Sequence, residues 1–489
     1  MASLEGSSLY DKQPGKRCHG PDRPNCSTRG ALCRRQPMRL PERSDQSQND
    51  KLRDGFLLAL SWHARQSSAT ANMSKYSILS LLEQAASQPH SWQPQWRKAE
   101  PRQTYDVVVI GGGGHGLGTA YYLAKEHELR NIAVLEKGWI GGGNTGRNTT
   151  IVRSNYLLEE SAAIYDHALK LWEALSQDLN YNVMFSQRGV MMFAHSVHDV
   201  QVLKRHHYAN RLAGIASEWL APEQAKAFCP PLDISPAGRY PVIGATLQRR
   251  GGTARHDAVA WGYARAADRL GVDIVENCEV TAICRDANGA VSGVETNRGF
   301  IRARRIAVVA AGETSVLMAM AGLRMPLESY PLQALVSEPV KPVFPCVVMS
   351  NAVHAYISQS DRGELVIGAG TDQYVSYSQT GSVHILQHAL EAICEMFPIF
   401  RRMRMLRSWG GVVDVTPDRS PIIGKTPVAG LFVNCGWGTG GFKAIPGSAH
   451  CFAWTVARDE PHPINAAFSL DRFRTGRLIN EAAAAAVSH

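Results

Sequence analysis

The chain has 489 residues, of which 44% are hydrophobic and 19% charged, and it carries a formal net charge of +9. This composition is typical of a globular protein, and the length indicates two or three domains or one large domain with an insertion. Residues 1–72 hold 12 Lys and Arg against 7 Asp and Glu, so five of the nine excess positive charges lie there. The remaining chain is only weakly basic, which argues against a nucleic-acid partner.

The sequence also argues against a membrane protein and a disulfide-rich one. No stretch approaches the roughly 20 uninterrupted apolar residues needed to span a bilayer. The apolar run 56–62 is too short for the core of a signal peptide. The ten cysteines are scattered, with no CxxC pair and no metal-like spacing with histidine. We therefore expect a cytoplasmic protein with reduced thiols, no metal site and no membrane partner.

The first part of the chain is predicted to be a disordered basic leader. Residues 1–72 are rich in Ser, Arg, Gln, Pro and Asp and show no sustained periodicity. Two interpretations stay open, a flexible tail or an upstream extension that takes no part in function. Met73 begins a segment with apolar residues at helical spacing, so we expect a helical arm over 73–104 and a true start at Met73 in the second case.

A βαβ unit follows the arm. Residues 106–110 (DVVVI) form a β-branched run typical of a buried parallel strand. A glycine-rich turn and a predicted helix over 119–127 come next, and the apolar run 132–135 then ends at Glu136. The turn, GGGGHG from Gly111 to Gly116, satisfies G-x-G-x-x-G, and Glu136 lies 20 residues beyond it. Strand, helix, spacing and terminal acid together predict a dinucleotide site with the pyrophosphate at the helix N-terminus.

A second glycine-rich loop indicates FAD rather than NAD. The segment Gly141–Thr150 (GGGNTGRNTT) follows the first unit closely. Backbone donors and small polar side chains in such a loop suit the extended FAD, although an ordinary flexible loop is the alternative. Further along, periodicity predicts helices over 257–270, near 385–397 and near 449–457, and strands over 272–275, 280–283 and 306–311.

From about residue 75 to the C-terminus the chain resembles a known family. The motifs that carry the resemblance are YDVVVIGGGGHG, VLEKGWIGGGNTGRNTTIVRSNY, GGTARHDAVAWGYARAAD, PLQALVSEPVKP, WGGVVDVTPDRSPIIGKTP and NCGWGTGGFK. They resemble the β subunits of heterotetrameric sarcosine oxidases, within the D-amino-acid-oxidase-like FAD-dependent amine oxidases.

The resemblance implies an α/β fold: an FAD-binding, Rossmann-like domain of the glutathione-reductase type and a discontinuous α+β substrate domain on a mixed or antiparallel sheet. It assigns 105–165, 245–320 and 406–470 to the FAD-binding domain. It assigns 166–244 and 321–405 to the substrate or cap domain, and leaves 471–489 as a C-terminal tail.

The resemblance also implies which residues hold FAD. Those around the pyrophosphate and adenosine would be Gly111, Gly113, Gly114, His115, Gly116, Glu136 and, at the adenine edge, Val280. Those from the second loop and the flavin side would be Asn144, Thr145, Arg147, Thr149, Ile151, Gly438, Gly441 and Lys443. Related monomeric sarcosine oxidases attach FAD through a cysteine shortly before a TPD motif. Residues 411–418 contain no cysteine here, which implies non-covalent FAD.

A second flavin is implied by His256 in TARHDAVAW, which matches the histidine that carries FMN covalently in this family. Taken alone, one histidine ahead of a helix is more often a cap or a surface residue. Two flavins would let electrons pass from FAD to FMN and then to oxygen, giving peroxide.

The implied substrate is a small amino acid, whose carboxylate needs a fixed cation. Arg153 and Lys443 are the candidates, and Tyr356 is expected to close the pocket. Lys443 also resembles a lysine that assists oxygen activation in related oxidases, so carboxylate binding and that role stay open.

The predicted function is sarcosine oxidation to glycine. The one-carbon unit would go to formaldehyde or, through a partner subunit, to tetrahydrofolate, with α, γ and δ subunits as partners. The alternatives are an oxidase or dehydrogenase of another secondary or tertiary amino acid, such as dimethylglycine or D-proline, and a non-catalytic flavin-bearing structural subunit.

Overall fold

The computed structural model describes residues 78–86 and 94–481. The predicted leader and Met73 lie outside these residues, whereas the expected helical arm contributes one helix, α2. The helices are α2 (Ile78–Ala86), α3 (Gly114–Glu126), α4 (Glu159–Asp178), α5 (Val197–Leu212), α6 (Pro222–Phe228), α7 (His256–Arg269), α8 (Thr314–Met320), α9 (Val383–Met396), α10 (Gly441–Arg458) and α11 (Arg472–Thr475).

The first sheet contains the predicted βαβ unit. Its strands run in the order β17, β18, β11, β1, β2, β8, and the hairpin of β9 and β10 joins at β11. The central pairs are parallel, from β18 through β11, β1 and β2 to β8. The bounds are β1 (Thr104–Ile110), β2 (Ile132–Leu135), β8 (Asp273–Val275), β9 (Val280–Arg285), β10 (Val291–Thr296), β11 (Gly299–Val308), β17 (Ile422–Lys425) and β18 (Leu431–Cys435).

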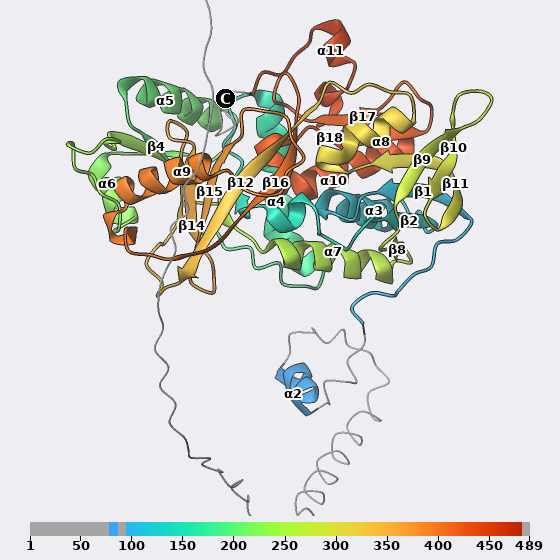
Figure 1. Ribbon diagram of the computed structural model, residues 1–489, viewed down its shortest axis with the longest axis horizontal. Coiled ribbons are helices and arrows are strands. Elements are labelled where there is room, and N and C mark those ends of the chain that lie inside the picture. The colour runs from blue at the N-terminus through green and yellow to red at the C-terminus, as the bar shows by residue number, and fades with distance from the viewer. Residues whose placement is uncertain (1–77, 87–93, 482–489) are drawn as a thin grey trace, which may run out of the picture. The chain divides into compact units, whose positions relative to one another are not determined.

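Both faces of this sheet are covered, which explains the continuous β-branched run of β1. Val107 and Val109 pack in one core with α3, α7 and α10, and Val108 and Ile110 pack in another with α8 and the β9–β10 hairpin. Successive side chains of a strand point to opposite faces, so both sets must be apolar. Figure 1 shows α3, α7, α8 and α10 around these strands.

The second sheet is mostly antiparallel, in the order β16, β12, β15, β14, β13, β4, β6, β5, with one parallel pair, β13 and β4. Helices α5, α6 and α9 lie on this side of the molecule in Figure 1. The bounds are β4 (Val190–Ala194), β5 (Glu218–Leu220), β6 (Gly244–Gln248), β12 (Glu328–Pro339), β13 (Val347–Ser350), β14 (Ala355–Gln359), β15 (Glu364–Thr371) and β16 (Met405–Val415). A small antiparallel pair is formed by β3 (Ile151–Val152) and β7 (Gly252–Thr253).

The fold class is confirmed, and several element boundaries differ from expectation. Helix α3 begins at Gly114, inside the glycine-rich turn, because these glycines form its first turn. Strands β6 and β16 pair within the second sheet, although the predicted ranges 245–320 and 406–470 place them with the first. For β16 the reason is β12, which pairs with it from Glu328 to Ser337. The domain division itself stays a prediction.

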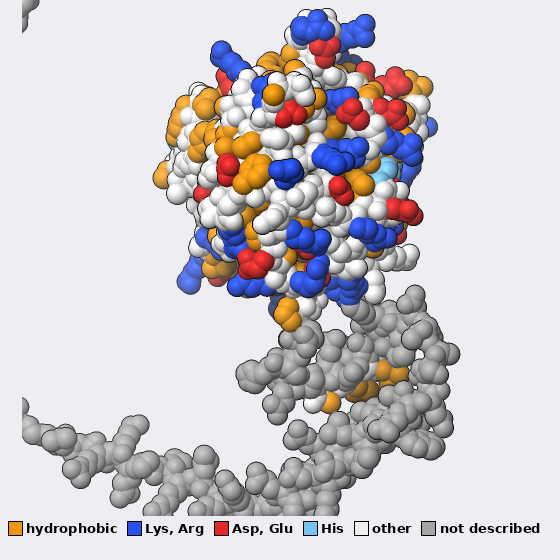
Figure 2. Space-filling model, turned by 90° about the vertical axis from the view of Figure 1, so that its right-hand side faces the viewer, with side chains coloured by type: hydrophobic (Ala, Val, Ile, Leu, Met, Phe, Trp, Pro, Cys, Tyr) orange, Lys and Arg blue, Asp and Glu red, His pale blue; other side chains and the backbone are white. Residues whose placement is uncertain are grey.

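The surface charge and the helices do not narrow the class of protein further. On the face shown in Figure 2, Lys and Arg side chains are interspersed with Asp and Glu. Within residues 78–86 and 94–481, none of the helices combines the length and the apolar character needed to cross a membrane.

Candidate active site

The glycine-rich turn after β1 is shaped by two positions where no side chain fits. Gly111 has a φ of +117°, and a Cβ there would lie 2.3 Å from the carbonyl oxygen of Val309. A Cβ on Gly116 would lie 2.0 Å from the carbonyl oxygen of Gly111. These close backbone approaches place the N-terminus of α3 directly after β1, which is the arrangement of a pyrophosphate site.

Glu136, at the end of β2, holds this turn in place. Its carboxylate accepts hydrogen bonds from the backbone N–H of Gly112 and of Gly138, both at 2.8 Å. The predicted contact with a ribose would therefore be made by a carboxylate whose orientation is already fixed by two amides.

The second glycine-rich loop is anchored on both sides. The hydroxyl of Thr145 accepts a hydrogen bond from the N–H of Gly114 at 3.0 Å. The side chain of Asn144 donates to the carbonyl of Val412 in β16, and Arg147 donates to Gln379 at 2.9 Å. The loop thus connects the turn before α3 to the second sheet.

A cavity of about 480 Å³ lies between these loops and the second sheet. The predicted residues that line it come from segments far apart in the chain: Gly111, Gly113, Gly114, His115, Glu136, Asn144, Thr145, Arg147, Thr149, Ile151, Arg153, Val280, Tyr356, Gly438, Gly441 and Lys443. Gly116 and His256 do not line it. Gly116 instead provides the close packing of α3 against the turn.

Two buried cationic side chains face the cavity. Arg153 is 2% exposed, donates to the side-chain oxygen of Asn155 at 2.9 Å and lies over the ring of Tyr156 at 4.4 Å. Lys443 is 7% exposed and donates to the carbonyl of Thr439 at 2.9 Å. Burial, and then the charge of Arg153, lower the pKa of Lys443 well below its ordinary value. An anion bound here would offset this cost.

His115 connects α3 to the closing motif. Its Nδ1 lies 2.9 Å from the hydroxyl of Ser448 and its Nε2 lies 2.9 Å from the carbonyl oxygen of Gly441. The ring stacks on Trp437 with centroids 5.1 Å apart. Burial lowers the pKa of His115 to about 4, so the ring is neutral at neutral pH. This imidazole fixes the start of α10, which carries Lys443.

Tyr356 in β14 lines the cavity from the second sheet. A Cβ on Gly368, its partner in β15, would lie 1.8 Å from the ring of Tyr356, so only glycine leaves room for it. Burial raises the pKa of the hydroxyl, which faces the side chain of Thr149.

His256 is placed apart from this cavity. It is the first residue of α7, half-buried, and follows Arg255, which pairs with Asp257. Burial lowers the pKa of the imidazole. The charge of Asp257 opposes this shift, and the charges of Arg255 and of Arg407 in β16 add to it.

Sequence reasoning missed three buried groups around the cavity. Asn434 accepts a hydrogen bond from the indole of Trp437 at 2.7 Å. The carboxylate of Asp414 accepts from the N–H of Gly436, and burial raises its pKa. All three line the cavity. The signal was present, since Asn434 and Trp437 belong to NCGWGTGGFK and Asp414 to WGGVVDVTPD.

The fold and the cavity define a flavin-dependent class of protein, and comparison with known families agrees. Residues 106–454 match the family described as FAD dependent oxidoreductase. The chain belongs to this family. The residues present fit the cofactor, because Gly111, Gly113 and Gly114 line the cavity where α3 begins, at the place where a pyrophosphate would lie.

Relatives narrow the class, and the resemblance to sarcosine oxidase β subunits is confirmed. The chain is 55% identical over 417 residues to sarcosine oxidase subunit beta of Rhodobacter capsulatus, covering 85% of this chain and all of the relative. It is 56% identical over 394 residues to the subunit of the same name from an Arthrobacter species, covering 81% and 97%.

Among solved structures, L-proline dehydrogenase from P. horikoshii is similar, with a TM-score of 0.72 and 27% identity. The match covers 78% of this chain and 100% of the other.

Proposed function

We propose that this protein oxidises sarcosine to glycine as the catalytic β subunit of a multi-subunit oxidase. The observation that carries the proposal is the buried pair of Arg153 and Lys443 in a cavity that is also lined by the dinucleotide turn. Two desolvated cations beside a cofactor site suit a small substrate with a carboxylate. The high identity to relatives named sarcosine oxidase subunit beta supports the choice of amine.

FAD would be held without a covalent bond. The pyrophosphate would lie against Gly111–Gly116, the adenosine near Glu136 and Val280, and the flavin near Gly438, Gly441 and the loop from Asn144 to Ile151. When bound, FAD supplies a two-electron acceptor for the N-methyl C–H bond of the substrate.

The residues of this chain bind and orient the substrate. Arg153 would hold the carboxylate, with Asn155 and the ring of Tyr156 fixing the guanidinium. Lys443 would add a second positive charge, and Tyr356 would close the pocket. The cationic surroundings favour the neutral form of the substrate amine.

The net reaction balances with oxygen and water. Sarcosine, O2 and H2O give glycine, formaldehyde and H2O2. Where a partner subunit supplies tetrahydrofolate, the one-carbon unit would pass to it in place of release as formaldehyde. The α, γ and δ subunits of a heterotetrameric oxidase are the proposed partners, in the cytoplasm.

A second flavin, FMN, would be attached covalently to His256. The imidazole is kept neutral by burial, which suits a nucleophilic nitrogen. Arg255 and Arg407, whose charges reach this ring, would suit the phosphate of FMN.

Steady-state assays of the co-expressed complex test the substrate. Sarcosine, dimethylglycine and D-proline are compared by kcat/KM, with peroxide, formaldehyde and glycine quantified. We expect sarcosine to be preferred and one glycine to form per peroxide. A higher kcat/KM for either competitor would replace sarcosine as the substrate, and no turnover of all three would refute amine oxidation.

Acid precipitation of the same complex tests the flavins. We expect one FAD in the supernatant and one flavin retained on a peptide that contains His256. His256→Asn should abolish the retained flavin and leave the FAD. Release of all flavin from the wild type would exclude the covalent FMN.

A further inference from the structure

A second group of ligating side chains lies where helices α3, α4 and α10 meet. His167 of α4 and His450 and Cys451 of α10 each offer one ligand atom, and these atoms lie within 4.8 Å of one another. Cys451 is fully buried and both histidines are half-buried. None of the three lines the cavity described above, so the proposed oxidation does not use them.

The two imidazoles face each other through their ring nitrogens. Nε2 of His167 lies 3.1 Å from Nδ1 of His450. Nε2 of His450 lies 3.1 Å from Oε2 of Glu126, and this hydrogen bond lowers the pKa of the carboxyl. Because the carboxylate of Glu126 accepts the Nε2 proton, Nδ1 of His450 carries the lone pair that faces His167.

We propose that His167 Nε2, His450 Nδ1 and Cys451 Sγ bind one zinc ion, with Glu126 orienting His450. Imidazole and thiolate ligands favour Zn²⁺, whereas Mg²⁺ and Ca²⁺ prefer oxygen ligands. A carboxylate on the other ring nitrogen is the usual second partner of a zinc-bound histidine. Tetrahedral zinc spaces such ligand atoms by roughly 3.3–3.6 Å, so small side-chain rotations close the site.

Binding exchanges protons for the metal. The proton between the two imidazoles moves to Nδ1 of His167, and the thiol of Cys451 releases its proton to solvent as the zinc–sulfur bond forms. Water completes the four-coordinate shell.

The ion would join α4 to α10 and, through Glu126, to the end of α3. His450 follows Lys443 by seven residues on α10, which is roughly 10 Å along a helix. Zinc would therefore stabilise the helix that carries Lys443 without contact to the substrate.

Zinc content and X-ray absorption of the untagged holoenzyme test the site. The complex is stripped with a chelator, dialysed against limiting Zn²⁺ and analysed for metal. We expect His167→Gln and Cys451→Ser each to bind one zinc fewer per β chain than the wild type. The absorption spectrum should show one sulfur neighbour at about 2.3 Å and nitrogen neighbours at about 2.0–2.1 Å. Glu126→Gln should weaken zinc binding by about 10–100-fold.

The controls keep the result interpretable. His384→Gln, which changes an exposed histidine on α9, should leave the zinc content unchanged. Bound FAD reports whether each variant is folded, and the half-buried His167→Gln is the variant most tolerant of change. Equal zinc content in the wild type and His167→Gln, or a zinc shell without sulfur, would overturn the proposal.

Discussion

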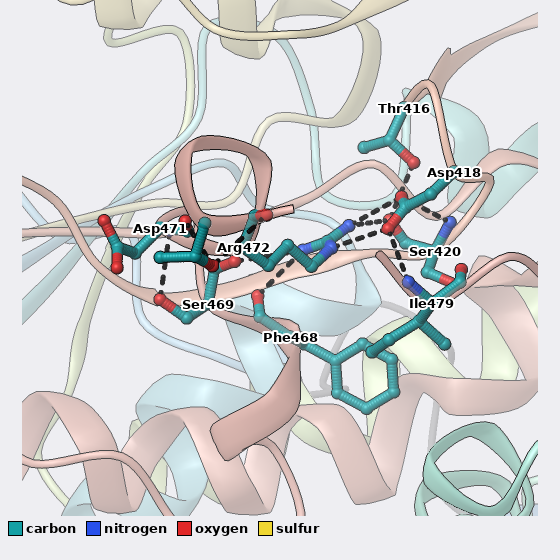
Figure 3. A network of polar contacts seen from close by, with 9 residues as sticks. Thr416, Asp418, Ser420, Phe468, Ser469, Asp471, Arg472 and Ile479 are labelled. Carbon is teal, nitrogen blue, oxygen red and sulfur yellow. Dashed lines mark hydrogen bonds and ion pairs between the residues drawn. The ribbon is translucent and has the colours of Figure 1, made fainter. Parts of the chain in front are cut away.

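Two buried cationic groups of this protein lie in opposite electrostatic situations. Arg472 donates to both oxygens of Asp418, at 2.7 and 2.9 Å, and to the carbonyl of Ser420 at 2.7 Å (Figure 3). Asp418 also accepts from the N–H of Ile479 at 3.0 Å. Lys443, by contrast, contacts a carbonyl oxygen, and the ion pairs seen within residues 94–481 give it no carboxylate partner.

The two groups should therefore contribute to different properties, Arg472 to stability and Lys443 to ligand binding. A charge pair with every oxygen satisfied holds the segment around α11 against the loop before β17, and offers nothing to a ligand. The cationic end of the cavity carries an electrostatic cost that a bound carboxylate would offset, so we expect its residues to serve recognition. Substitutions in the two regions should therefore affect different measurements.

The largest effect is expected from breaking the ion pair of Asp418 and Arg472. Asp418→Asn leaves Arg472 buried without its anion, which should lower the free energy of unfolding by about 3–5 kcal/mol. Burial acts to raise the pKa of Asp418, but the hydrogen bonds and charge of Arg472 outweigh it and keep that pKa below its usual value. The stabilisation is therefore present above about pH 4 and is lost as the pH falls further.

Urea unfolding at pH 7 and at lower pH measures this change. The difference between wild type and Asp418→Asn should shrink below about pH 4, while KM for sarcosine per folded enzyme stays the same. An unchanged unfolding midpoint at pH 7 would show that the pair does not stabilise the fold.

Arg153→Met instead removes one of the two buried cationic groups of the cavity. It should raise KM for sarcosine by about 30-fold or more, because losing one side of a buried charge-assisted pair costs about 2–5 kcal/mol. Steady-state kinetics at saturating oxygen measure it, with the thermal midpoint as the control. Arg153→Lys should recover part of the loss. A KM within twofold of the wild type would remove Arg153 from the substrate site.

The parts of the fold that depend on local sequence could be predicted, and those that depend on distant strand partners could not. The βαβ unit, its glycines and Glu136 were predictable because strand periodicity, turn chemistry and spacing act within about 30 residues. The sheet membership of β6 and β16 was not, because it depends on partners such as β12 that lie elsewhere in the chain.

For the site, the structure shows that Arg153, Lys443 and Tyr356 line one cavity, and their roles stay predictions. The contacts that hold these side chains in place could not be predicted from the sequence. Short motifs do not show that His115 fixes the start of α10. The pair of His167 and His450 left no spacing signal, since 283 residues separate them.

A smaller, pH-dependent effect should identify Lys443 as a carboxylate ligand. Burial and Arg153 lower its pKa, so the lysine is cationic below that pKa and neutral above it. Binding of propionate, a carboxylate without an amine, should weaken as the pH rises through this value, well below the pH expected for a free lysine. Lys443→Met should bind propionate weakly with a flat pH profile. A profile that stays identical in both enzymes would assign the titration to another group.

The smallest effect is expected at Tyr356. Tyr356→Phe removes one hydroxyl but keeps the ring that Gly368 accommodates, so KM for sarcosine should rise by about 2–10-fold, the equivalent of one hydrogen bond. The kcat should hardly change if the hydroxyl only closes the pocket. Gly368→Ala should do more harm than Tyr356→Phe, because its Cβ would lie 1.8 Å from the ring and must displace it. A kcat that falls with KM unchanged in Tyr356→Phe would instead place this hydroxyl in the chemical step, and the second sheet would then contribute to catalysis as well as to binding.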